Sequence, residues 1–114
     1  MKIEKFEDII AWQKSEKLVF EIYDKFRRCR DYIFKDQICR AVISIMNNIA
    51  EGFERRTNND FKRFLYIAKG SCAEVRSMLY LAEGFGYITE KDFKKIHQEA
   101  TEISKILSGF IKTL

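Results

Sequence analysis

The chain of 114 residues contains no proline, so long helices can form in it without interruption. It has one histidine, His97, and three cysteines, none of which belongs to a Cys-x-x-Cys pair. A structural zinc site needs four nitrogen or sulfur ligands, so we expect no metal, no other cofactor and reduced, buried thiols. A single histidine also gives no convincing Ser-His-Asp or Cys-His-Asp set. These shortages predict a protein that is not an enzyme.

Long apolar runs are missing as well. The first ten residues, MKIEKFEDII, mix acidic and basic side chains, whereas a signal peptide has an uninterrupted apolar core. The longest purely apolar runs are far shorter than the roughly 20 residues of a membrane-spanning helix. We therefore expect a cytoplasmic protein without a membrane partner. The length and the 46% share of hydrophobic residues predict a single globular domain over residues 1–114.

The apolar residues recur with the period of a helix, and no stretch alternates with the period of a strand. The expected helices cover residues 8–28, 34–56, 60–85 and 90–114. The third helix has candidate N-cap oxygens in Thr57, Asn58 and Asn59, and Thr89 can cap the fourth helix. Gly86 suits the left-handed conformation that ends a helix. Connections this short make neighbouring helices antiparallel. The predicted fold is all-α, an antiparallel up-down-up-down four-helix bundle.

Polar residues interrupt the apolar run of the second helix in the stretch SIMNNIAEG. At about 100° per residue these side chains form one continuous stripe. In an antiparallel hairpin of the second and third helices, Ser71 lies opposite Ser44, and Glu74 lies opposite residues 40–42. We name the polar residues on the two sides of this helix contact the polar seam. Its members are Arg40, Ser44, Asn48, Glu51, Ser71 and Glu74.

Two interpretations of the polar seam are open: a hydrogen-bonded contact that fixes helix register, and a catalytic or metal-binding carboxylate site. Di-iron bundles use Glu-x-x-His, but the residue three positions before His97 is Lys94. His97 lies at the edge of a polar helix side, where we expect it to be exposed. A buried unpaired carboxylate costs several kcal/mol, so we expect Glu74 to pair with Arg40. The seam is predicted to be structural, with no catalytic residue.

Positive charge is concentrated in the middle of the chain. Residues 25–76 have a net charge of +6, against +4 for the whole chain. One face of the third helix carries the basic stripe, which consists of Lys62, Tyr66, Lys69, Arg76 and Tyr80. Such cations bind phosphates, and tyrosines between them stack on bases of RNA or of single strands. The candidate nucleic-acid-binding residues are Lys62, Arg63, Tyr66, Lys69, Arg76, Arg55 and Arg56. The other interpretation is a solvated face whose tyrosines lie in a subunit contact.

Some apolar residues are left over once one bundle core is filled. Ile9 and Phe20 lie together outside the main apolar face of the first helix, and Ile43 lies beyond the arc that the second helix needs. Exposed apolar surface of this kind marks interfaces. We therefore expect an oligomer with Ile9, Phe20 and Ile43 in its subunit contacts.

Four motifs carry a resemblance to a known family: FEDIIAWQKSEKLV from Phe6, QICRAVISIMNNIAEG from Gln37, FLYIAKGSCAE from Phe64 and FGYIT from Phe85. The chain resembles the four-helix-bundle proteins encoded by intervening sequences of bacterial 23S ribosomal RNA genes. That family is similar to the accessory protein of diversity-generating retroelements, a basic, ring-shaped pentamer that binds nucleic acid and a reverse transcriptase. The resemblance implies a homopentamer.

Together, these features predict a non-enzymatic, oligomeric four-helix bundle that binds nucleic acid, RNA in particular, or that assists an enzyme acting on nucleic acid. The alternative is a protein-protein interaction scaffold that does not bind nucleic acid directly. A small hydrolase or metal protein is a third class.

Overall fold

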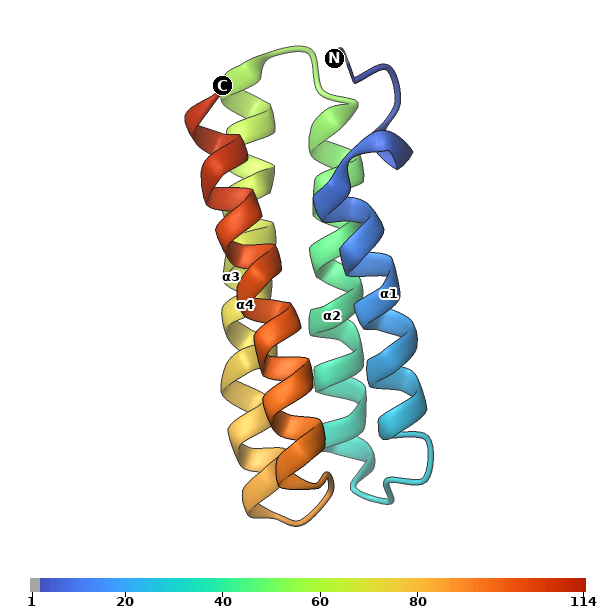
Figure 1. Cartoon of the computed structure of the whole chain (residues 1–114). Coiled ribbons are helices and arrows are strands. Elements are labelled where there is room, and N and C mark those ends of the chain that lie inside the picture. Colours follow the sequence, from blue (N-terminus) through green and yellow to red (C-terminus); the bar gives the residue numbers. More distant parts are fainter. Residues whose placement is uncertain (1–2) are drawn as a thin grey trace.

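The computed structural model describes residues 3–114, which form four long helices packed side by side (Figure 1). Residues 1–2 of the predicted domain lie outside the described residues. A short 3-10 turn, η1, precedes the first helix at Phe6–Asp8. The helices are α1 (Ile10–Lys25), α2 (Tyr32–Phe53), α3 (Asn58–Gly84) and α4 (Glu90–Lys112). No strand occurs in residues 3–114, so the all-α prediction is confirmed.

Successive helices run in opposite directions along a molecule of 43 × 22 × 19 Å (Figure 1). α1 packs on α2 and α4, α2 packs on α3, and α3 packs on α4. The arrangement leaves α1 and α3 on opposite corners of the bundle. It confirms the predicted up-down-up-down topology, and it gives α3 an outer face that no helix of the same chain covers.

The ends of the helices follow their capping residues. Thr57 Oγ1 accepts a hydrogen bond from Asp60 N at 3.1 Å, and Thr89 Oγ1 accepts one from Asp92 N at 3.0 Å. Gly86 has a φ of 79°, which lies in the left-handed region that glycine adopts without strain. Thr57 is thus the one of the three candidates that caps α3, since Asn58 and Asn59 already belong to the helix. The predicted cap of α4 and the predicted turn at Gly86 are confirmed.

The start of α2 depends on Asp31, a capping residue that helical periodicity does not predict. Asp31 accepts a hydrogen bond from Phe34 N at 3.2 Å, and its other carboxylate oxygen accepts one from the Tyr87 hydroxyl at 2.6 Å. The hydrogen bond from Tyr87 is the main reason that the pKa of Asp31 is lowered. This contact ties the α1–α2 connection to the α3–α4 connection at the same end of the bundle.

The core is an apolar column to which all four helices contribute. Its fully buried side chains include Leu18, Ile22, Ile38, Ile45, Leu65, Leu79, Ile96 and Leu107. Cys39 and Cys72 are buried, Cys29 is half-buried, and none of the three forms a disulfide. Burial raises the pKa of Cys72 to about 12, so this thiol stays protonated at neutral pH. Cys39 and Cys72 therefore act as small apolar side chains of the core.

The helices α2 and α3 pack closely together beside Gly52. A Cβ atom placed on Gly52 would lie 2.6 Å from the Cβ of Phe64 and 3.0 Å from Cδ1 of Phe61. Real side chains do not tolerate such distances, so this position of α2 requires glycine. The glycine of the SIMNNIAEG stretch is thus explained by helix packing.

We expect Gly52→Ala to lower the free energy of unfolding by about 1–3 kcal/mol, because the added methyl group overpacks the α2–α3 contact. Gly70→Ala is the matched control, since a Cβ at Gly70 meets no atom within 4 Å. It should stabilise the protein by about 0.5–1 kcal/mol through helix propensity. Urea denaturation followed by circular dichroism, at one protein concentration, measures both changes. A Gly52→Ala protein as stable as the unmutated one would contradict the close approach.

Candidate nucleic-acid interface

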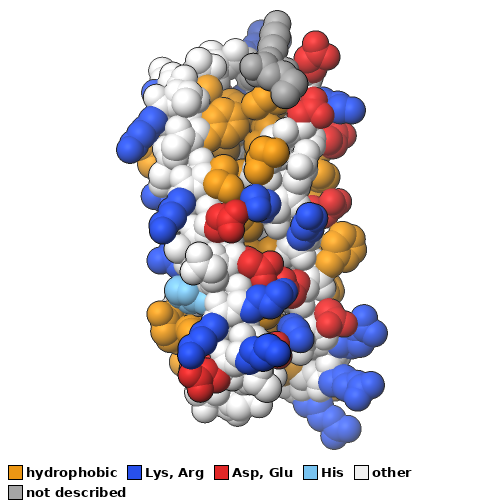
Figure 2. Space-filling model, in the orientation of Figure 1, with side chains coloured by type: hydrophobic (Ala, Val, Ile, Leu, Met, Phe, Trp, Pro, Cys, Tyr) orange, Lys and Arg blue, Asp and Glu red, His pale blue; other side chains and the backbone are white. Residues whose placement is uncertain are grey.

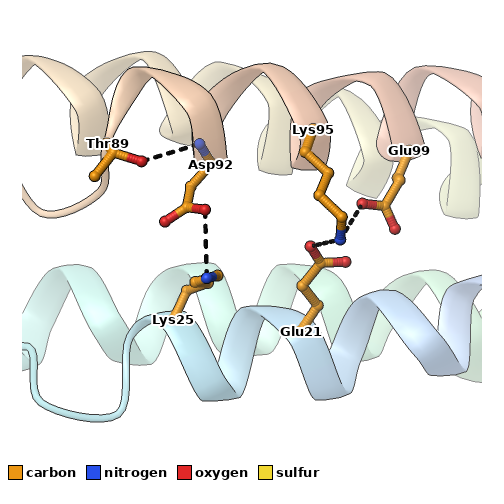
Figure 3. A network of polar contacts seen from close by, with 6 residues as sticks. All are labelled: Glu21, Lys25, Thr89, Asp92, Lys95 and Glu99. Atoms are coloured by element: carbon orange, nitrogen blue, oxygen red, sulfur yellow. Dashed lines mark hydrogen bonds and ion pairs between the residues drawn. The ribbon is translucent and has the colours of Figure 1, made fainter.

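Charges along the α1–α4 contact compensate one another. Lys95 Nζ lies 2.6 Å from Glu21 Oε1 and 3.3 Å from Glu99 Oε1, and Lys25 Nζ lies 3.3 Å from Asp92 Oδ1 (Figure 3). The hydrogen bond to Glu21, followed by that to Glu99, raises the pKa of Lys95. Red and blue side chains accordingly intermingle on the face between these helices (Figure 2). This face offers little net charge to a ligand.

The basic stripe on α3 is arranged differently. Its cations, Lys62, Lys69 and Arg76, are half-buried and form no ion pair with any of residues 3–114. Tyr66 lies between Lys62 and Lys69 along the helix, and Tyr80 lies one turn beyond Arg76. The two tyrosines are 60% and 59% exposed. The stripe therefore keeps an uncompensated positive charge beside exposed aromatic rings.

Acidic residues are nearly absent from the outer face of α3. Between Asp60 and Glu83 the helix contains one acid, Glu74. Glu74 points towards α2, where Oε2 accepts a hydrogen bond from Gln37 Nε2 at 3.5 Å. A polyanion approaching the basic stripe thus meets no carboxylate of α3 over most of the length of the helix.

Two arginines extend the positive surface to the α2–α3 turn. The guanidinium carbon atoms of Arg55 and Arg63 lie 4.6 Å and 4.7 Å from the centroid of the Phe64 ring. The face of an aromatic ring attracts such cations. Each also pairs with an acid one turn away, at 3.2 Å and 3.7 Å, which reduces its free charge. Arg56, also in the predicted set, is exposed in the same turn.

The polar seam contains one hydrogen-bonded group in the contact between α2 and α3. The Ser71 hydroxyl donates to Ser44 Oγ at 2.9 Å, and Asn48 Nδ2 donates to the Ser44 carbonyl at 2.8 Å and to its Oγ at 2.9 Å. Ser71 is buried, whereas Ser44 and Asn48 are half-buried. The predicted apposition of Ser71 and Ser44 is therefore confirmed.

The predicted buried pair of Arg40 and Glu74 is wrong, because both side chains are exposed. Glu74 lies about 60° further round the helix from Ser71, enough to leave the buried shoulder of α3. Its carboxylate therefore stays hydrated, which costs less than burial in an ion pair. Glu51, another predicted member of the seam, pairs with Arg55 on its own helix and not across the contact.

We expect Ser44→Ala to lower the free energy of unfolding by about 1 kcal/mol, because it removes the oxygen that receives hydrogen bonds from both Ser71 and Asn48. Glu74→Ala should change stability by less than about 0.5 kcal/mol, because Glu74 is exposed. Thermal unfolding of the two variants compares these positions directly. A greater loss for Glu74→Ala than for Ser44→Ala would contradict the arrangement of the seam.

The predicted oligomer-contact residues occupy different environments. Phe20 is 70% exposed on α1, and Ile43 is half-buried against the core. Ile9 is only 2% exposed, so its predicted place on the surface is wrong. Helix α1 begins only at Ile10, so Ile9 lies just before it. The backbone of Ile9 after η1 is extended and directs its side chain inward. Ile10, which is 53% exposed, takes the surface position instead.

An apolar groove of about 710 Å³ lies between the start of α1 and the end of α4. The apolar residues that line it include Ile3, Ile9, Ile10, Ala11, Ile106 and Phe110. Figure 2 shows orange side chains gathered at this end of the bundle. The groove cannot be predicted from periodicity, because its walls come from opposite ends of the chain.

His97 is half-buried, which corrects the expectation that it is exposed. Its ring lies 5.2 Å from the ring of Tyr80 and 5.2 Å from that of Phe93, between centroids. Burial, followed by the positive charge of Arg76, lowers the pKa of His97. The histidine is therefore part of an aromatic group that joins α3 to α4.

Neither a metal cluster nor a membrane span is found in the part of the chain that the structure describes. Within residues 3–114, no three His, Cys, Asp or Glu side chains are grouped so that they could hold a metal ion. Among the described helices, none combines the length and the apolar character needed to cross a membrane.

The fold is a four-helix bundle, and the outer face of α3 is basic. Residues 7–109 match the family described as 23S rRNA-intervening sequence protein, and the chain belongs to this family. It is similar to the crystal structure of a protein of unknown function from the S23 ribosomal protein family of Bacteroides thetaiotaomicron, with a TM-score of 0.85 and 29% identity. The similarity covers 90% of this chain and 99% of that chain. No curated protein matches the chain.

Proposed function

We propose that the protein is a non-enzymatic, oligomeric four-helix bundle that binds nucleic acid, with RNA as the expected ligand. In this role it is the partner of an RNA or an accessory to an enzyme that acts on nucleic acid. The observation that carries this proposal is the uncompensated charge of Lys62, Lys69 and Arg76 beside two exposed tyrosines. The alternative function is a protein-protein interaction scaffold that does not touch nucleic acid.

The spacing of the basic stripe suits a chain of phosphates. Lys62, Lys69 and Arg76 follow one another at intervals of seven residues, and each interval rises about 10.5 Å along the helix. The three cations thus extend over about 21 Å, a distance that spans several phosphates of a strand. Neutralising these phosphates releases bound counterions, so the binding would weaken steeply as salt is added.

We expect Lys62→Ala, Lys69→Ala and Arg76→Ala each to weaken RNA binding modestly, whatever the sequence of the RNA. Each should also flatten the slope of log affinity against log salt by about 0.7 for a single strand, because one phosphate contact is lost. Tyr66→Ala should weaken single-stranded binding and leave the slope unchanged. Fluorescence anisotropy with a labelled RNA, over a salt series, measures affinity and slope together.

Lys17→Ala is the matched control, because Lys17 is an exposed lysine of α1, on the opposite corner of the bundle from α3. This variant should bind RNA with the affinity and the salt slope of the unmutated protein. If the unmutated protein binds neither RNA nor DNA at low salt, the scaffold function replaces the proposal.

Exposed apolar surface supports the oligomeric part of the proposal. Phe20 and Ile10 of α1 are mostly exposed, and Ile10 lines the apolar groove between α1 and α4. Contact with a second copy would remove this surface from water, at about 25 cal/mol per Å² before the costs of association. A head-to-tail contact between unlike surfaces closes into a ring when its rotation permits. The pentamer implied by the resemblance to the retroelement accessory protein fits such a ring.

Light scattering coupled to size exclusion should report about 68 kDa, five times the chain mass of 13.6 kDa. Phe20→Asp should lower this mass and leave the helix content unchanged, because it places a charge on an exposed contact residue. Gln98→Asp adds the same charge at an exposed polar position of α4 and should leave the mass as it is. A monomer at micromolar concentration would exclude the oligomer.

A further inference from the structure

An aromatic cluster lies on the surface where α3 and α4 meet. It consists of Tyr80 from α3 and of Phe93 and His97 from α4, and its ring centroids are 4.9 Å apart for Tyr80 and Phe93 and 5.2 Å apart for the other two pairs. Phe93 and His97 are half-buried, whereas Tyr80 is 59% exposed. The pale-blue histidine lies beside orange side chains in Figure 2. Each ring thus contacts the other two, and more than half of Tyr80 remains open to solvent.

A cation without a carboxylate partner stands beside the aromatic cluster. Arg76 precedes Tyr80 by one helical turn, and its charge contributes to the electrostatic environment of His97. Its Nε atom is buried and has no hydrogen-bond partner among the described residues, and its guanidinium group forms no ion pair with them. Lys69 lies two turns further along the same stripe. An aromatic surface and free positive charge are therefore adjacent.

The two tyrosines of the basic stripe differ in the aromatic rings that pack against them. Tyr66 is 60% exposed and has no aromatic neighbour within residues 3–114. Tyr80 is equally exposed, but Phe93 and His97 hold its ring from α4. A ring that is already held loses less conformational freedom when a ligand stacks on it. Tyr80 is therefore the better prepared of the two to receive a flat ligand.

We propose that the aromatic cluster and Arg76 form a binding site for one unpaired nucleobase of a single-stranded nucleic acid, with the base stacked on Tyr80 and the adjoining phosphate against Arg76. This inference rests on the proposed nucleic-acid binding, and it specifies an unpaired strand as the ligand. A base inside a duplex is already stacked between its neighbours, and it reaches Tyr80 only if it is turned out of the helix. Phosphates further along the strand continue towards Lys69.

The test compares three labelled RNA ligands: an unstructured strand of 12 nucleotides, a strand of the same length with abasic sugars, and a duplex of the same sequence. Fluorescence anisotropy gives the affinity of each, at several salt concentrations. The two single strands have equal numbers of phosphates, so a difference between them reports the bases alone. We expect the strand with bases to bind more tightly than the abasic strand.

Tyr80→Ala should weaken binding of the strand with bases by about 5- to 150-fold, the range found when one stacking aromatic is removed. Its affinity for the abasic strand and its salt slope should not change. Tyr80→Phe keeps the ring and should bind as the unmutated protein does. Tyr23→Ala removes a partly exposed tyrosine of α1 and serves as the matched control, without effect on either strand.

Phe93→Leu provides a second variant, in which an apolar side chain remains but the ring behind Tyr80 is lost. It should weaken binding of the strand with bases in the same selective way, to a smaller extent. Circular dichroism and light scattering confirm that each variant keeps its helices and its assembly. The selective loss in these two variants would establish the site independently of any effect on folding.

The possible failures of the inference and of the proposed function are distinct. Equal binding of both single strands, unaffected by Tyr80→Ala, would overturn the stacking site, while a steep salt slope would keep the proposed function. An equal loss for duplex and single strand in Tyr80→Ala would also overturn the site, because an unpaired base would not be its ligand. Absence of binding to all three RNAs at low salt would overturn both.

Discussion

The close contact between α2 and α3 is the constraint on which the rest of the structure depends. At Gly52 there is no room for a side chain against Phe61 and Phe64. Further along the contact, the hydrogen bond between Ser44 and Ser71 fixes the register of α2 against α3. Because the buried side of α3 must face this contact and the core, helical geometry turns the basic stripe away from α2. The requirements of packing thereby determine which face of α3 is offered to a partner.

The distribution of charge follows from the same arrangement. α1 and α4 lie beside each other, so Lys95 and Glu21 can reach across and compensate one another (Figure 3). α3 lies diagonally from α1, and the acid of its middle portion, Glu74, turns towards α2. A chain with a net charge of only +4 can therefore present a face with unpaired cations. The net charge of the chain alone would not reveal that its cations are distributed unevenly over the surface.

Helical periodicity and the lack of proline were sufficient to predict the fold, and the hairpin geometry placed Ser71 opposite Ser44. The surroundings of other residues depend on information that periodicity does not contain. Ile9 precedes the helix by one residue, so a helical projection gives it the wrong direction. Glu74 lies on the border between buried and hydrated sides, where a rotation of a few tens of degrees decides the outcome. The neighbours of His97 depend on how α4 packs on α3, which a single helix cannot specify.

The central claim is that the unpaired cations of α3 form the surface that binds nucleic acid. The most direct test is the salt dependence of RNA binding for the triple variant Lys62→Ala, Lys69→Ala, Arg76→Ala, compared with the unmutated protein at equal helix content and equal assembly mass. The account predicts a slope lower by about 2 units for a single-stranded RNA, because three phosphate contacts are lost. An unchanged slope in a protein that still binds RNA would contradict it, since the phosphates would then lie on another face.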